Sequence, residues 1–205
     1  ERYRAEQRAA VLQRIRALAT EVNQALVRAA DRAEIESRVC GILSDASPYL
    51  FVWIGEHDPE TGTVEARAMA GAERDYLDTV EITADGDDTG RGPTGKAVRT
   101  RETAVTNDVR TDEEYEPWRE AALDRGYRSS AAVPLVYDDT LYGVLNVYAD
   151  RPGAFDDRER DLLEGLGDDI AHAIHTQEVR QERRRRVARL EALFEQSPDM
   201  IDVHD

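Results

Sequence analysis

The sequence predicts an α+β domain built on one antiparallel sheet, with helices on one face and loops plus short helices on the other. Two uncharged or alternating apolar stretches, residues 49–70 and 129–148, have the pattern of hairpins. Helical stripes of apolar residues lie before and after them, at 31–46 and 156–177. The irregular segment 72–126 is left to cover the second face of the sheet, and a face covered in this way favours a small-molecule pocket.

The composition is typical of a protein that works in high salt. The 205 residues include 43 acidic and 27 basic ones, for a net charge of −16, and Lys96 is the only lysine. Carboxylates hold a dense hydration layer, and the long apolar stem of lysine is avoided. The alternative is an ordinary acidic cytosolic domain. Either surface argues against nucleic acid as a partner, because no broad basic face is present to neutralise phosphates.

The sequence also indicates where the domain works. A single cysteine, Cys40, excludes an internal disulfide and a cysteine-rich zinc site. No apolar run has the length needed to span a bilayer, and no signal peptide is visible. We therefore expect a cytoplasmic domain with no membrane contact. Both ends look cut, so we also expect a fragment of a longer protein.

The N-terminal segment, residues 1–30, predicts a long helix with a narrow apolar seam. Its members recur at spacings of three and four: Leu12, Ile15, Ala19, Val22, Leu26 and Ala29. Such a seam suits a partner helix, and the alternative is packing against its own domain. The charged flanks favour the partner helix.

The next elements are a helix and a hairpin. Asp31 is placed to cap a helix that Ser47-Pro48 ends. Residues 49–54 then predict a buried strand, and residues 63–70 alternate as a strand with one partly wet face.

The middle of the chain is the least regular. It predicts a short strand at 78–84, a glycine-rich acidic loop at 85–95 and a short helix from Lys96. A brief strand at 103–107 and a surface helix at 113–125 follow.

The second hairpin and the last helix complete the plan. Pro134 lies inside a strand that should be central, so we expect an irregularity there. Asp156 is placed to cap a long helix that continues through Arg183–Arg186 to Ser197-Pro198. Within that helix the arginine run is interpreted as a solvated connector.

Several of these segments together resemble a GAF domain. They are GRGPTGKAVRT (90–100), TAVTND (103–108), PWREAALDRGYRS (117–129) and AAVPLVYDDTLYGVLNVYADRPGAF (131–155). The acidic, arginine-rich version is similar to GAF domains of haloarchaeal sensory regulators of the bacterio-opsin-activator and transducer types. The last residues, LEALFEQSPDMIDVHD (190–205), resemble the start of a PAS domain.

The resemblance implies a six-stranded antiparallel sheet, a ligand pocket and a homodimer formed through flanking helices. It divides the chain into a signalling helix (1–30), a GAF domain (31–177), a helical linker (178–190) and a truncated PAS start (191–205). The implied function is signal transduction in a two-component type of regulator, relayed to downstream PAS and output domains. The alternative is a ligand-free structural dimerisation module of a sensor kinase or transcription regulator. No enzyme is expected in this fragment, although a histidine kinase domain elsewhere in the protein is compatible with it.

The sequence lacks most of the residues that the known chemistries of GAF domains require. Cyclic-nucleotide-binding members carry an Asn-Lys pair, whereas Asn146 is followed by Val147. Bilin-binding members need a cysteine in or near the pocket, and Cys40 is expected to be buried in a helix stripe. Sulfoxide-reducing members need several cysteines. His172 and His175 are spaced i, i+3, but no third metal ligand is suggested, and no cofactor follows from the sequence.

The pocket candidates are apolar and aromatic residues with two polar ones, from segments that should converge. They are Trp53, Met69, Tyr76, Val98, Trp118, Ser130, Ala132 and Asn146. Plain core packing is the alternative for each. Trp118 has a strong argument because a tryptophan on a charged short helix needs a surface to cover. Asn146 is the one strongly hydrogen-bonding side chain in an apolar strand.

Overall fold

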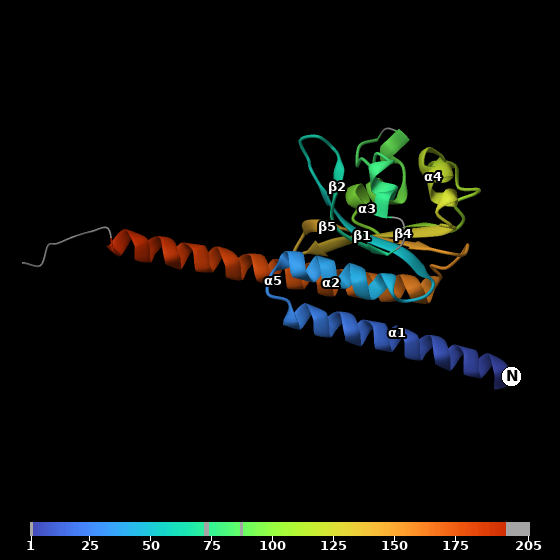
Figure 1. Cartoon of the computed structure of the whole chain (residues 1–205), viewed down its shortest axis with the longest axis horizontal. Coiled ribbons are helices and arrows are strands. Elements are labelled where there is room, and N and C mark those ends of the chain that lie inside the picture. The colour runs from blue at the N-terminus through green and yellow to red at the C-terminus, as the bar shows by residue number, and fades with distance from the viewer. Residues whose placement is uncertain (1, 72–73, 87, 196–205) are drawn as a thin grey trace, which may run out of the picture.

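The computed structural model describes residues 2–71, 74–86 and 88–195 (Figure 1). Its described strands form one antiparallel sheet in the order β2-β1-β5-β4-β3. The strands are β1 (Tyr49–His57), β2 (Val64–Gly71), β3 (Ala104–Thr106), β4 (Ser129–Tyr137) and β5 (Thr140–Ala149). The long helices are α1 (Arg2–Arg28), α2 (Arg32–Ser44) and α5 (Asp157–Glu195). The short ones are η1 (Arg74–Asp78), η2 (Asp88–Gly90), α3 (Pro93–Thr100), η3 (Glu113–Trp118) and α4 (Arg119–Asp124).

Each face of the sheet has its own apolar core. The long helices α2 and α5 lie on one face, α1 lies beneath them, and the short helices lie on the other face (Figure 1). On β5, Val147 belongs to the helix-side core and Tyr148 to the loop-side core. This alternation is the period of two that a strand requires, and cover on both faces explains why the strands are apolar throughout.

The expectation of six strands is wrong for the described residues, which form a five-stranded sheet. The segment 78–84 makes only an isolated bridge, between Thr83 and Thr63. Local contacts compete for its backbone. The amide and the hydroxyl of Thr79 both donate hydrogen bonds to the Tyr76 carbonyl. The Trp118 indole N–H donates to the Glu81 carbonyl.

The β4–β5 hairpin forms in the expected register, with an irregularity close to the expected place. The register shifts between Leu135 and Val136, one residue beyond Pro134. The pairing of β3 with β4 ends at Ala132, so β4 is an edge strand at Pro134, where a missing N–H costs least.

The expected helix caps are present. The Asp31 side chain accepts the Glu34 amide at 2.9 Å. The Asp156 side chain accepts the amides of Arg158 and Glu159, each at 3.1 Å, and α5 begins there. The expected end of this helix at Ser197-Pro198, and most of the expected PAS start, lie outside the described residues.

The partner-helix interpretation of the α1 seam is wrong for most of its length. Val22, Leu26 and Ala29 are buried in the core that α2 and α5 share. A side chain of α5 also bonds to this region, because the Gln177 amide donates to the Ala29 carbonyl. The seam therefore completes the cover of the domain's own helices, and only its start, at Leu12, is exposed. Heptad spacing alone does not identify the surface that a seam contacts.

Among the residues that the structure describes, no helix combines the length and the apolar character needed to cross a membrane.

Candidate ligand pocket

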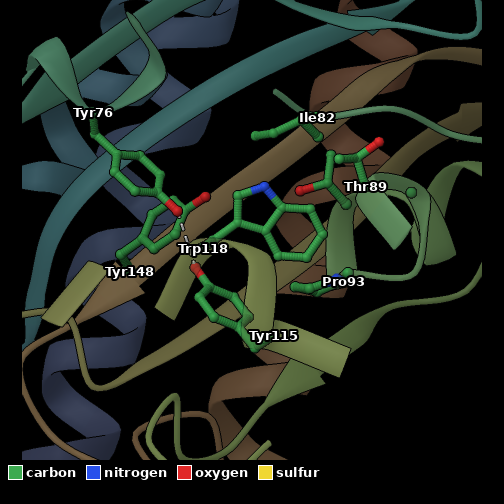
Figure 2. Close-up of a pocket in the computed structure, with 10 residues that line it drawn as sticks. Tyr76, Ile82, Thr89, Pro93, Tyr115, Trp118 and Tyr148 are labelled. Atoms are coloured by element: carbon green, nitrogen blue, oxygen red, sulfur yellow. Dashed lines mark hydrogen bonds between the residues drawn. The ribbon is translucent and has the colours of Figure 1, made fainter. Parts of the chain in front are cut away.

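A small cavity lies on the loop side of the sheet, between β5, η1, the start of α3 and η3 (Figure 2). Its volume is about 10 Å³, which is room for about one water molecule. Its walls are mostly aromatic rings and threonine or glycine backbone: Tyr76, Ile82, Thr89, Gly92, Pro93, Thr94, Gly95, Tyr115, Trp118 and Tyr148.

The glycine-rich loop is folded tightly against this cavity. Arg99 of α3 donates to the carbonyls of Ala84, Asp85 and Gly90 and so ties the loop to the helix that follows. Pro93 stands in the first turn of α3, where its fixed φ and missing N–H suit a helix start. The sequence places helix formation from Lys96, and the proline begins it three residues earlier.

Tyrosine hydroxyls form the polar part of the pocket. Tyr76 and Tyr115 point their hydroxyls toward one another, 3.3 Å apart (Figure 2). The Trp53 indole donates to the Tyr148 hydroxyl at 3.2 Å. Burial raises the pKa of Tyr148 to about 12 and raises the pKa values of Tyr76 and Tyr115 well above the usual range. All three therefore remain protonated and can donate hydrogen bonds at neutral pH.

Trp118 fills the space that a ligand would need. It is 4% exposed, and its indole N–H donates to the Glu81 carbonyl at 2.9 Å. Its ring lies against Gly92, where an added Cβ would be 2.5 Å from it. It also meets the Tyr115 ring edge to face at a centroid distance of 5.7 Å. Glycine at position 92 is therefore what lets the indole close the cavity.

The structure brings two of the eight predicted residues, Tyr76 and Trp118, to the cavity wall. Asn146 lies one layer behind, where its side-chain oxygen accepts the Thr94 hydroxyl at 2.7 Å and so holds the first turn of α3. Ser130 is buried on β4, and its hydroxyl has no partner among the described residues. The others belong to the surrounding core: Trp53, Met69, Val98 and Ala132.

The prediction missed most of the polar groups of the pocket. Tyr148 was recoverable from the sequence, because it lies two residues beyond Asn146 and so on the same face of β5. Tyr115 precedes Trp118 by three residues on the same short helix, a spacing that places both on one side. Thr89 and the first turn of α3 carried no periodic signal, because their positions depend on how the loop folds back.

Other reactive groups lie away from this cavity. Cys40 is fully buried in the helix-side core, and burial raises the pKa of its thiol to about 12. His175 meets the Tyr142 hydroxyl at 2.7 Å, and His172 stacks on Tyr137 at 4.7 Å. The described part of the chain contains no group of three or more metal-ligating side chains.

Comparison with known sequences shows that the chain matches one protein family and is similar to two regulators. A family model described as a GAF domain matches residues 29–175. The chain is 33% identical, over 160 residues, to the bacterioopsin transcriptional activator of Halobacterium salinarum, covering 77% of this chain and 22% of that protein. It is 30% identical, over 164 residues, to a putative transcriptional regulator of Haloferax volcanii, covering 80% and 26%. The chain thus spans about a quarter of the length of these curated relatives.

Comparison with solved structures gives the fold. The GAF domain of a phosphoenolpyruvate-protein phosphotransferase from Coxiella burnetii superposes with a TM-score of 0.68 at 16% identity, covering 83% of this chain and 98% of that one. A free methionine-R-sulfoxide reductase from Neisseria meningitidis gives 0.67 at 19% identity, covering 80% and 90%. The family match ends before residues 191–205 and gives no support to a PAS domain there.

Proposed function

This chain belongs to the GAF domain family, and on that premise we propose that it is the small-molecule-sensing module of a haloarchaeal transcriptional regulator, acting in the cytoplasm. In this proposal a ligand occupies the pocket between β5, η1, α3 and η3, and its binding changes the setting of α5. The chain covers only 22% and 26% of the two regulators that it resembles, so in this proposal the output segment lies in parts of the regulator that this chain does not include.

The observation that carries the proposal is that one strand contacts both the pocket and the helix. Tyr148 of β5 lines the cavity, and Tyr142 of the same strand bonds to His175 of α5. Arg32 strengthens this link, because it donates to the Tyr142 carbonyl at 2.6 Å and to Glu178 of α5 at 2.7 Å. A ligand that displaces β5 would therefore bias the position of α5 where that helix leaves the domain.

The far part of α5 supplies the output surface in this proposal. The helix extends well beyond the sheet (Figure 1), and every described side chain from Val179 to Leu193 is exposed. Four of these exposed residues are large and apolar: Val179, Val187, Leu190 and Leu193. We propose that a second copy covers them, so that the flanking helices form a homodimer.

A structural dimerisation module is the second candidate. It is favoured by the small cavity, which at about 10 Å³ is already filled by the chain's own Trp118. In that case the pocket binds no ligand, and the function of the chain is dimerisation through its flanking helices.

Catalysis of the sulfoxide-reductase kind is not part of the proposal. The chain has one cysteine, and Cys40 lies on the opposite face of the sheet from the cavity. Its raised thiol pKa, a result of burial, keeps it protonated and weakly reactive.

A thermal-shift screen of small metabolites in molar salt decides between the two candidates. A ligand at one hundred times its Kd adds about 2.7 kcal/mol to the free energy of unfolding. For a chain of this size that raises Tm by about 5–10 °C. The sensory proposal expects at least one such ligand, and expects Tyr148→Phe to reduce its effect. A screen without any shift, combined with a dimeric mass, would favour the structural module.

A further inference from the structure

We propose that the exposed part of α5, residues 179–193, pairs with the same part of a second copy as a parallel, in-register coiled coil, and that a small inorganic anion binds in its core between the two Arg186 side chains. The inference rests on the proposed homodimer, because it names the orientation of the two helices and a binding site that neither copy has alone. Three features of α5 carry it: an apolar seam, two arginines within that seam, and a glutamate beside one of them.

The seam is a line of side chains that recurs at spacings of four and three along the exposed part of α5. Its members are Val179, Arg183, Arg186, Leu190 and Leu193. The three apolar members are 50% to 58% exposed, and this part of the helix extends beyond the sheet (Figure 1). Side chains at this spacing lie on one face of a helix, as the core positions of a two-stranded coiled coil do. The seam therefore suits a second helix, although two consecutive core positions carry a guanidinium group.

The two arginines of the seam differ from the other members of the run Arg183–Arg186. Arg184 and Arg185 lie at outer positions of the same heptad, where water solvates them. Arg183 and Arg186 make no hydrogen bond or ion pair with any residue that the structure describes, so both cations are available to a partner. Because they alternate with apolar side chains on one face, they suit a helix better than a phosphate backbone. The solvated-connector interpretation therefore accounts for only two members of the run.

Glu182 makes the charges of the seam complementary to those of a second copy. In a parallel, in-register pair, each core side chain enters a space bounded by four residues of the facing helix, and for Arg183 these include Glu182 of the second copy. Two symmetric ion pairs would then form across the interface. A reversed second helix with its apolar ends aligned would instead bring Arg183 against Arg186 and place Glu182 opposite Val187. The charges therefore favour a second copy in the parallel orientation.

Arg186 has no such acidic partner, and its position defines the anion site. Across a parallel interface it meets Arg183, Val187 and Leu190 of the second copy as well as the other Arg186. Two guanidinium groups that meet away from water repel each other and lose hydration unless an anion lies between them. A chloride ion there accepts hydrogen bonds from both groups. Because packed helices lie only about 8–10 Å apart, the site has room for a small anion and not for a bulky organic one.

The test compares the dimer dissociation constant of the whole chain in two salts of equal ionic strength, molar potassium chloride and molar potassium gluconate. Both salts screen charge to the same extent, but only chloride is small enough to enter a helix interface. We expect the wild-type dimer to be about tenfold weaker in gluconate than in chloride. Analytical ultracentrifugation measures the constant, and circular dichroism checks that each chain is folded.

Substitutions on the two sides of the helix locate the anion effect. Arg186→Leu removes the charge from the seam and should abolish the difference between the two salts. Arg186→Gln should do the same, since it removes the charge without adding an apolar side chain. The matched control is Arg185→Leu, which removes the same charge from an outer position of the same turn and should keep the tenfold difference.

Two cysteine variants in a Cys40→Ala background test the orientation. Val179→Cys and Leu193→Cys each place a thiol on the seam near one end of the exposed part. In a parallel, in-register pair each thiol lies beside its own copy, so both variants should form disulfide-linked dimers on mild oxidation. In a reversed pair with aligned apolar ends, position 179 lies opposite position 190, so identical thiols are at least about 16 Å apart along the helix and neither variant should link.

Four results would overturn the inference and leave a homodimer in place: equal dissociation constants of the wild type in the two salts, a full difference that persists in Arg186→Leu and Arg186→Gln, loss of the difference in Arg185→Leu as well, or seam cysteines that do not link. A chain that stays monomeric in both salts would overturn the inference and the homodimer together. The sensory function would then still be decided separately, by the thermal-shift screen.

Discussion

Single residues show how closely the sheet is linked to the helices that cover one of its faces. Glu36 of α2 is 1% exposed and accepts hydrogen bonds from Arg32 at 2.7 Å and from Arg67 of β2 at 2.8 Å. Arg32 also bonds to Glu178 of α5 and to the Tyr142 carbonyl of β5. One buried carboxylate and one arginine thus join two helices and two strands at the place where α5 leaves the domain.

Replacing Arg32 with Met should lower the free energy of unfolding by about 2 kcal/mol, because Glu36 would lose one of its two cationic partners while buried. Urea unfolding at constant salt measures the change. The control is Arg38→Met on the same helix, since the Arg38–Glu34 pair is largely exposed and should contribute less than about 0.5 kcal/mol. Equal costs for the two variants would contradict this account.

Asn146 illustrates what sequence reasoning finds and what it misses at this scale. An isolated amide in an apolar strand correctly signalled a specific hydrogen bond, but its partner is Thr94 of α3 and not the cavity itself. Trp118 and Tyr76 were predictable as aromatic groups in need of cover, and both line the cavity. Thr89 and the first turn of α3 were not predictable as parts of the cavity wall, because their positions depend on how the loop folds back.

Replacing Asn146 with Leu should leave the fold intact but release the Thr94 hydroxyl, at a cost of about 1–2 kcal/mol in the free energy of unfolding. It should also weaken any ligand that uses the first turn of α3. Urea unfolding measures the cost, and the rise in Tm that a ligand from the thermal-shift screen gives, with and without the substitution, measures the effect on binding. An unchanged rise in Tm would show that Asn146 does not position the site.

At the scale of elements, the hairpins were predictable and the setting of the helices was not. Continuous apolar runs determine β1, β4 and β5, because a strand covered on both faces leaves little choice of residue. The predicted sixth strand does not form, because Thr79 bonds to Tyr76 within the loop and the Glu81 carbonyl accepts the Trp118 indole N–H. The α1 seam was ambiguous because the same spacing serves a partner helix or the chain's own α2 and α5.

The packing of α1 makes a direct prediction. Val22 is fully buried against the helix-side core, whereas Val27 on the same helix is 86% exposed. Val22→Ala should cost about 2 kcal/mol in the free energy of unfolding, and Val27→Ala less than about 0.5 kcal/mol. Both values should be independent of protein concentration if α1 packs on its own domain. A cost for Val22→Ala that disappears on dilution would instead place this seam in an interface between copies.

At the scale of the whole molecule, charge dominates the response to solvent. The net charge of −16 repels itself in dilute buffer, and at molar salt the Debye length falls to about 3 Å, so this repulsion is screened. The urea midpoint should therefore rise markedly between low salt and molar potassium chloride. An Arg38→Met or Val27→Ala variant should follow the same curve as the wild type. A midpoint that does not move would contradict the salt-adapted interpretation of the composition.

The central claim is that occupation of the pocket changes the setting of α5. The most direct measurement is the distance between spin labels at position 187 of α5 in two copies, using Val187→Cys in a Cys40→Ala background. The measurement is made in molar salt, without and with a saturating concentration of the ligand that the thermal-shift screen identifies. The account predicts that the distance distribution shifts when the ligand is bound, and that Tyr137→Phe leaves this shift in place. An unchanged distribution at a ligand concentration that gives the full rise in Tm would contradict the claim.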